Sequence, residues 1–148
     1  MYDNEIINCG KSLSKDELIN IEVLIGQKMH SSLFVHFLKY NGGNPSSRNT
    51  FDGGGLIELQ VHSFLYVLEG KEEGLNFEDT VLSIINNKKL IPIDMLPFAS
   101  NEGGDYFCIC SRGKIYFCSM DFSDEYGNVT MISKSMKDFI NEMYELDW

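Results

Sequence analysis

The side chains of the four cysteines could bind a metal ion, form disulfides or remain reduced thiols. Cys108, Cys110 and Cys118 fall within one aromatic and β-branched stretch, whereas Cys9 lies near the start. The chain contains no Cys-x-x-Cys pair of the kind found in structural zinc sites. In the β-hairpin predicted below, Cys108 and Cys110 point to one face of the sheet and Cys118 to the other. We therefore expect small buried thiols and no metal site.

Two acidic residues at the start of the same hairpin are candidates for chemistry or for partner binding. Asp105 follows Gly103 and Gly104 at the entrance of a strand, where a carboxylate can accept backbone amides of a turn. A catalytic carboxylate needs a second acid or a base beside it. Glu102 is near in sequence, but two acids without a base, metal motif or nucleophile are a weak catalytic signal. We therefore expect Asp105 to have a structural role.

A second group of acids follows the hairpin and consists of Asp121, Asp124 and Glu125. Because this loop flanks the same hairpin as Glu102 and Asp105, all five side chains could form one acidic patch. Such a patch is either a solvated rim or a docking surface for a basic protein. These five residues are the candidate partner-binding residues.

The three histidines are His30, His36 and His62, and no predicted element brings them together. His36 lies in an apolar helical run and is expected to be a partly buried helix residue, and His62 lies on the polar face of a strand. The chain has no nucleophile-elbow, zinc-protease or P-loop motif. The glycines at 53–55 precede a strand, so they do not match a dinucleotide fingerprint. We expect no catalytic residues and no cofactor.

Composition limits the class of protein and its partners. The chain has 148 residues, 43% of them hydrophobic, which fits one domain over 1–148 with a sizeable core. Its net charge of −10 disfavours nucleic acid and anionic membranes and favours a basic protein partner. No apolar run is long enough to span a bilayer and the start resembles no secretory signal, so we expect a cytoplasmic protein. The oligomeric state stays open.

The hairpin that carries the cysteines is the predicted centre of the fold. Its strands cover 106–110 and 115–118, and a polar loop between them contains Gly113, where a positive φ is expected. With a loop of two or four residues, Cys110 faces Ile115. Both faces of the hairpin are apolar, which indicates a central position covered on both sides.

The other predicted elements surround this hairpin. A helix begins at Ser14 with a capping box to Glu17 and ends at Gly26, and its apolar stripe includes Leu24. The remaining elements are helices at 32–40, from Asn76 to about 86 and from Ser135, a loop at 46–55, a strand at 57–62 with one wet face, and extended segments at 90–99 and 129–133. Short connections after residue 90 make these strands mostly antiparallel. The order predicts an α+β domain with a central, mostly antiparallel sheet flanked by helices.

Short motifs occur in a fixed order along the chain: LSKDELINIE at 13–22, FLKYNGGNP at 37–45, LPFA at 96–99 followed by GGDYFC at 103–108, GKIYF at 113–117 and SMKDF at 135–139. Each motif is common, but their order and spacing over about 13–146 resemble the SMI1/KNR4, or SUKH, superfamily. The chain departs from the family pattern at Met29-His30, where Leu-Pro is usual, and at Cys118, where a Trp is frequent.

This resemblance implies an α+β fold with a largely antiparallel sheet. Bacterial members resemble immunity proteins of contact-dependent and polymorphic toxin systems, which block a toxin that is often a nuclease or another nucleic-acid-modifying enzyme. Fungal relatives regulate cell-wall synthesis as interaction modules. The resemblance implies no catalytic set, and it implies a structural role for the matching residues Asn41, Gly42, Gly43, Gly103, Gly104 and Asp105.

Three hypotheses for function follow. The leading one is a cytoplasmic immunity protein that binds a basic toxin domain. The second is a non-enzymatic regulatory module that binds another protein. The third is an enzyme, which requires a pocket where Asp105 or Glu102 meets a histidine or a metal.

Overall fold

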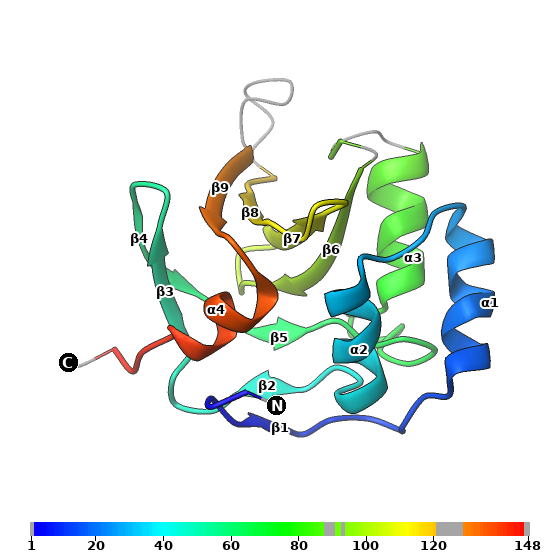
Figure 1. The fold of residues 1–148 in the computed structure, drawn as a ribbon, viewed down its shortest axis with the longest axis horizontal. Coiled ribbons are helices and arrows are strands. Elements are labelled where there is room, and N and C mark those ends of the chain that lie inside the picture. Colours follow the sequence, from blue (N-terminus) through cyan, green and yellow to red (C-terminus); the bar gives the residue numbers. More distant parts are fainter. Residues whose placement is uncertain (1, 88–90, 93, 121–128, 147–148) are drawn as a thin grey trace.

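The computed structural model describes residues 2–87, 91–92, 94–120 and 129–146. Its largest sheet has five antiparallel strands in the order β5-β6-β7-β8-β9 (Figure 1). The strands are β5 (Ser63–Phe64), β6 (Met95–Ser100), β7 (Tyr106–Cys110), β8 (Ile115–Cys118) and β9 (Val129–Ser133). The predicted hairpin strands are confirmed, and β7 is the middle strand of the sheet. The predicted α+β architecture with an antiparallel sheet and flanking helices is also confirmed.

The register of the hairpin differs from the prediction by one residue. The loop has three residues, because the Cys110 N–H donates to the Lys114 carbonyl and the Gly113 N–H donates to the Cys110 carbonyl. Gly113 has a φ of 83°, as expected, and this loop with a glycine bulge places Ile109 opposite Ile115. A loop of odd length reverses the facing of one strand relative to the other.

The shifted register puts all three hairpin cysteines on one face of the sheet, so the prediction of opposite faces is wrong. Cys108 pairs with Tyr116 and Cys118 pairs with Tyr106, which makes the two cysteines diagonal neighbours. The pKa of the Cys108 thiol is raised by burial and by its hydrogen bond with Cys118. The three hairpin thiols are buried, as expected, but Cys9 is exposed.

Two small antiparallel sheets lie beside the large one. One pairs β1 (Ile6–Ile7) with β2 (Asn44–Pro45), and the other pairs β3 (Thr50–Gly53) with β4 (Leu56–Gln60). The prediction of a loop throughout 46–55 is therefore wrong. A strand forms because Thr50 and Phe51 are buried, with the Phe51 ring 4.9 Å from that of Phe139.

The predicted alternation of the strand at 57–62 also fails in part. Ile57 is 70% exposed, although the pattern placed it on the buried face. Glu58 has a φ of 53°, which interrupts the pleat and turns the side chains before it. Glycines 53 and 54 bring the tip of the hairpin so close to β9 that an added Cβ would lie 2.2 Å from the Ile132 and Met131 carbonyl oxygens.

Four α-helices pack around the sheet: α1 (Lys15–Ile25), α2 (Ser31–Lys39), α3 (Phe77–Val81), which continues as a π-helix η1 (Leu82–Asn87), and α4 (Met136–Asn141). The capping box of Ser14 and Glu17 and the left-handed Gly26 stop are confirmed. Leu24 was expected in the apolar stripe, but it is 55% exposed because α1 packs only its other side inward. His30 caps α2, since its Nδ1 accepts the Ser32 N–H.

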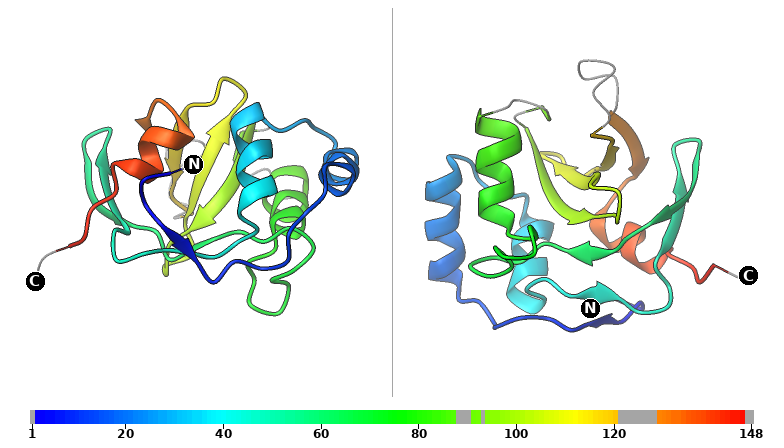
Figure 2. Two further views of the ribbon diagram at one scale, coloured as in Figure 1. Left: turned by 60° about the horizontal axis from the view of Figure 1, so that its bottom comes forward. Right: turned by 180° about the vertical axis from the view of Figure 1, so that it is seen from behind.

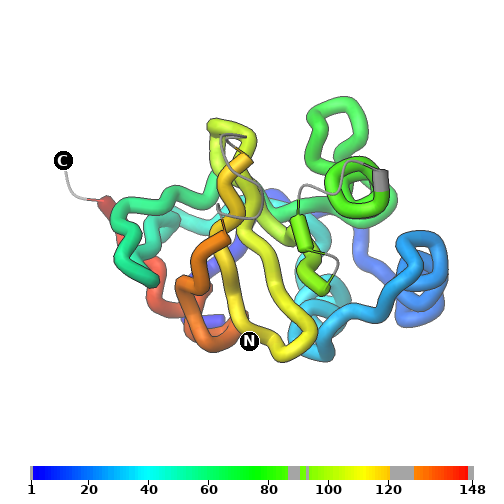
Figure 3. Tube along the Cα trace, turned by 90° about the horizontal axis from the view of Figure 1, so that it is seen from above, coloured from blue at the N-terminus to red at the C-terminus, as the bar shows by residue number. Residues whose placement is uncertain are grey.

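The core lies between the sheet and helices α2, α3 and α4. Phe139 of α4 lies against Phe98 and Phe107 of the sheet, with ring centroids 5.8 and 5.3 Å apart. Helix α1 packs on α2 and α3 on the outside (Figure 3). The β3–β4 hairpin lies at the opposite end of the molecule (Figure 2). Within the described ranges, no helix is long and apolar enough to cross a membrane.

His36 of α2 is fully buried, whereas only partial burial was expected. Its Nδ1 lies 3.0 Å from the Tyr2 hydroxyl, and its Nε2 has no hydrogen-bond partner among the described residues. Aromatic rings enclose it, including that of Phe64 in β5 at 5.3 Å and that of Tyr40, the C-cap residue of α2, at 5.6 Å. Burial lowers the pKa of His36 to about 3, so the imidazole is neutral at pH 7.

Candidate functional site

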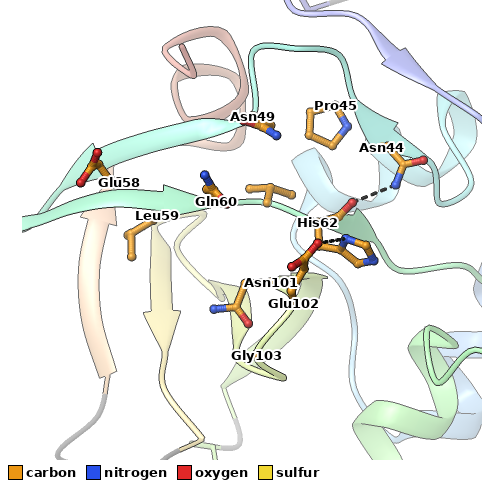
Figure 4. Close-up of a pocket in the computed structure, with 11 residues that line it drawn as sticks. Asn44, Pro45, Asn49, Glu58, Leu59, Gln60, His62, Asn101, Glu102 and Gly103 are labelled. Carbon is orange, nitrogen blue, oxygen red and sulfur yellow. Dashed lines mark hydrogen bonds and ion pairs between the residues drawn. The ribbon is translucent and has the colours of Figure 1, made fainter. Parts of the chain in front are cut away.

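An open groove of about 400 Å³ lies between the β3–β4 hairpin and the turn that joins β6 to β7 (Figure 4). Its described lining carries two carboxylates, several amides and one imidazole, and contains no Lys or Arg. The lining consists of Asn44, Pro45, Asn49, Glu58, Leu59, Gln60, Val61, His62, Asn101, Glu102 and Gly103. The groove therefore presents negative charge and hydrogen-bonding groups, which suit a cationic partner.

The groove exists because the chain from β4 to β5 changes partner. The Val61 N–H donates to the Asn49 carbonyl at 2.8 Å, which continues the pairing with β3. The next residue, His62, donates its N–H to the Ser100 carbonyl at 2.8 Å, which begins the pairing with β6. At this point the two sheets diverge, and the space between them is open.

His62 and Glu102 meet at the edge of the groove, with 3.7 Å between His62 Nδ1 and Glu102 Oε1. This is the carboxylate–histidine contact that the enzyme hypothesis requires. The two side chains are 49% and 86% exposed, and the described lining has no Ser, Thr, Cys or Lys that could act as a nucleophile. The contact has the character of a surface ion pair, which forms when His62 is protonated.

In the part of the chain that the structure describes, no group of three or more His, Cys, Asp or Glu side chains is arranged to hold a metal ion. The three hairpin thiols share a face of the sheet, but they are buried in the hydrophobic core. The groove itself offers Glu58, His62 and Glu102, of which only the last two are in contact.

Asp105 closes the turn that borders the groove. Its carboxylate accepts the Met120 N–H at 2.7 Å and the Asn101 side-chain amide at 3.1 Å. Its own N–H donates to Asn101 Oδ1 at 2.9 Å. Both carboxylate oxygens are thus engaged within the protein, and they tie the segment after β8 to the β6–β7 turn. Gly104 supplies the positive φ of 87° that this turn requires.

The five predicted partner-binding residues therefore have different positions. Glu102 lies on the groove, whereas Asp105 lies beside it and is engaged in its turn. Asp121, Asp124 and Glu125 lie outside the described residues.

Glu58 is a groove residue that sequence reasoning missed. Its positive φ is held by Asp52, whose Oδ1 accepts the Glu58 N–H at 2.8 Å and the Tyr144 O–H at 2.7 Å. Both hydrogen bonds hold the pKa of Asp52 below its usual range, and the bond from the Glu58 N–H has the larger effect. The hydrogen bond between Tyr144 and Asp52 also raises the pKa of Tyr144 to about 12. The signal for this hairpin was Asp52 followed by glycines 53–55, a pattern typical of a turn.

The Asn41-Gly42-Gly43 segment positions the start of β2, whose residues Asn44 and Pro45 line the groove. The Asn41 carboxamide is buried and joins Lys11, Val67 and Glu69 through its amide, and its oxygen accepts the Val67 N–H at 2.7 Å. A Cβ at Gly42 would lie 2.1 Å from the Tyr66 ring, and one at Gly43 would lie 2.6 Å from the Ile7 carbonyl oxygen. Only glycine fits at either position.

The fold defines the class of protein as a small α+β domain with one main antiparallel sheet and flanking helices. The chain belongs to the SMI1 / KNR4 family (SUKH-1), whose family model matches residues 12–142. A crystal structure of a protein from Pseudomonas syringae pv. tomato has a similar fold, with a TM-score of 0.52 and 14% identity over 78% of this chain and 75% of that one. At that identity the likeness concerns the fold alone. No curated protein matches the chain.

Proposed function

We propose that this chain is an immunity protein, which binds a cognate toxin of a polymorphic or contact-dependent system and neutralises it. The observation that carries the proposal is membership of the SMI1/KNR4 family over residues 12–142. The toxin is a nuclease or another enzyme that modifies nucleic acid, as the family resemblance implies. Neutralising such a toxin requires the immunity protein to be in the cytoplasm.

The charge of the chain supports a basic partner. Its net charge is −10, and the groove lining contributes Glu58 and Glu102 without a described Lys or Arg. A toxin that acts on nucleic acid needs a basic cleft to bind phosphates. An acidic protein is attracted to such a cleft and can cover it.

The proposed binding surface is the groove together with the five acids expected from the sequence. Glu102 is exposed and available to a partner, whereas Asp105 acts mainly by shaping the turn. The acids proposed for this surface are Glu58, Glu102, Asp105, Asp121, Asp124 and Glu125. The open groove admits side chains of the partner between Glu58 and Glu102.

Co-expression tests the proposal directly. The chain is expressed in cells together with the toxin domain encoded by the neighbouring gene, and survival is measured. We expect survival with the wild-type chain and loss of protection with the double variant Glu58→Lys/Glu102→Lys, because two reversed charges repel a basic cleft.

The matched control is Glu72→Lys/Glu73→Lys, which makes the same charge change in the exposed loop at 71–74, outside the groove. This control should protect as well as the wild type. Cell death with the wild-type chain would contradict the immunity function. Recovery of a housekeeping protein as the stable partner, with no toxin gene nearby, would instead support the regulatory interaction module.

A further inference from the structure

The backbone polar groups of Gln60 point away from β3, the strand with which β4 pairs. Thr50 donates its N–H to the Tyr144 carbonyl at 3.1 Å and accepts the Tyr144 N–H at 2.8 Å, so both its polar groups face away from β4. Thr50 and Gln60 are directly opposite in the β3–β4 register. In an antiparallel pair, they are therefore a pair that exchanges no hydrogen bonds. It follows that the Gln60 N–H and C=O also face outward, away from β3.

No strand of the described residues occupies that outward side. Pairing with β6 begins only at His62, and beyond Ser100 the chain turns away through Asn101, Glu102 and Gly103. Gln60 is exposed, and its backbone has no hydrogen-bond partner among the described residues. A free N–H and C=O on a strand edge are a template for an added strand. Gln60 lines the groove, so the open space is available to such a strand.

The charges around this edge select the kind of segment that can be added. Glu58 lies two residues before Gln60 on the same strand, and Glu102 lies across the groove (Figure 4). Several amides of the lining are already engaged, such as Asn44 with the His62 carbonyl at 2.8 Å and Asn101 with Asp105. The groups left for a partner are thus mainly the strand edge and the two carboxylates. A second copy of this chain, with its charge of −10, is a poor occupant.

We infer that the groove takes an extended segment of the basic toxin, which pairs its main chain with Gln60 and directs Lys or Arg side chains to Glu58 and Glu102. This inference rests on the proposed function and adds the form in which the partner is recognised. Main-chain pairing supplies affinity, and the two carboxylates supply the preference for basic residues.

The test measures hydrogen exchange of the Gln60 amide by NMR, in the free chain and in the complex with the toxin domain of the neighbouring gene. We expect exchange in the complex to slow by at least about tenfold, because the N–H becomes hydrogen bonded. Fast exchange at Gln60 in a complex that neutralises the toxin would overturn this inference and leave the proposed function intact. Failure of co-expression would overturn both. Slow exchange in the free chain that depends on its concentration would show pairing with a second copy and would also overturn the inference.

Two variants at the same position provide an independent readout of binding. Gln60→Pro removes the outward N–H, which has no partner in the fold, and a strand edge of this kind tolerates proline. Gln60→Ala removes the side chain but keeps the N–H. We expect the proline variant to bind the toxin domain about tenfold more weakly than the alanine variant, the effect of about one backbone hydrogen bond, because the alanine variant keeps the N–H. Equal affinity of the two variants would contradict the inference, and thermal unfolding checks that both remain folded.

Discussion

At the scale of single residues, Asn41 joins segments that are far apart in the sequence. The residue is 3% exposed, and its carboxamide bonds to the backbone of Lys11 and Val67 and to the side chain of Glu69. Buried polar groups of this kind stabilise the fold mainly by forming hydrogen bonds with one another, because each buried group without a partner costs free energy. The residue therefore fixes the position of Gly42 and Gly43, and through them the start of β2.

The Asn41→Ala variant should lower the free energy of unfolding by about 3 kcal/mol, because it leaves the Val67 N–H and two carbonyls without their partner. Urea unfolding followed by circular dichroism measures the change. The control is Asn20→Ala on the exposed side of α1, which should change stability by less than about 0.5 kcal/mol. A loss at Asn41 no larger than at Asn20 would show that water replaces the carboxamide.

His36 makes the stability of the fold depend on pH. Its pKa is about 3 in the folded state because of burial, and about 6.5 when unfolded. Between these values the unfolded chain binds the proton and the folded chain does not. The stability that depends on a neutral His36 is therefore fully present above pH 6.5, and it is lost as the pH falls toward 3.

We expect the free energy of unfolding to fall by up to about 1.4 kcal/mol per pH unit below pH 6.5, in excess of the change in a Tyr2→Phe/His36→Phe variant. The double variant removes the imidazole together with the hydroxyl that bonds to it. Urea unfolding between pH 7.5 and 5, above the range where most carboxylates titrate, measures the difference. Parallel pH profiles of the two proteins would mean that His36 accepts a proton without unfolding.

At the scale of elements, the hairpin of β7 and β8 shows where sequence reasoning succeeds and where it ends. Its strands were predicted correctly, because aromatic and β-branched runs and a glycine loop are local signals. Its register was predicted wrongly, because the loop length depends on the packing of Gly113 against residues that are distant in the sequence. A Cβ at Gly113 would lie 2.7 Å from the His30 ring, which caps α2. The hairpin loop and the start of α2 therefore constrain each other.

The Gly113→Ala variant should lose about 2–3 kcal/mol of stability, from the strain of a positive φ and from displacement of the His30 ring. Gly104→Ala is the matched control, since its φ of 87° is similar to the 83° of Gly113 but nothing lies within 4 Å of an added Cβ. It should lose only about 1 kcal/mol, the cost of the backbone strain alone. Equal losses, measured by thermal unfolding, would show that the His30 contact is unimportant.

At the scale of the whole molecule, the groove could not be predicted from the sequence. Its lining comes from four segments, at 44–45, at Asn49, over 58–62 and over 101–103, which become neighbours only when the sheets form. Glu102 was found because it borders a recognisable glycine turn. Glu58 was missed because an alternating pattern conceals its positive φ. Likewise, Leu24 and Ile57 fit periodic patterns but are exposed. A periodic pattern does not show which part of a helix or strand is covered by another element.

The overall charge predicts how association with the proposed toxin partner responds to salt. The association rate constant should fall about tenfold or more between about 50 mM and about 500 mM NaCl, because salt screens the attraction of a chain with net charge −10. The dissociation rate constant should change much less. Stopped-flow kinetics measures both, and the Glu58→Lys/Glu102→Lys variant should show a shallower dependence. An association rate insensitive to salt would contradict electrostatic steering.

The change of partner between β4 and β5 has a consequence for how such a protein can evolve. Along this strand, Val61 and Phe64 are buried, whereas Gln60 and His62 are exposed to the groove. Under the proposed immunity function, neighbouring codons therefore face opposite selection: one set preserves the core, and the other is free to follow a changing toxin. The shape of the groove is set by the backbone, so a lineage can replace its recognition surface one residue at a time and keep a stable fold throughout.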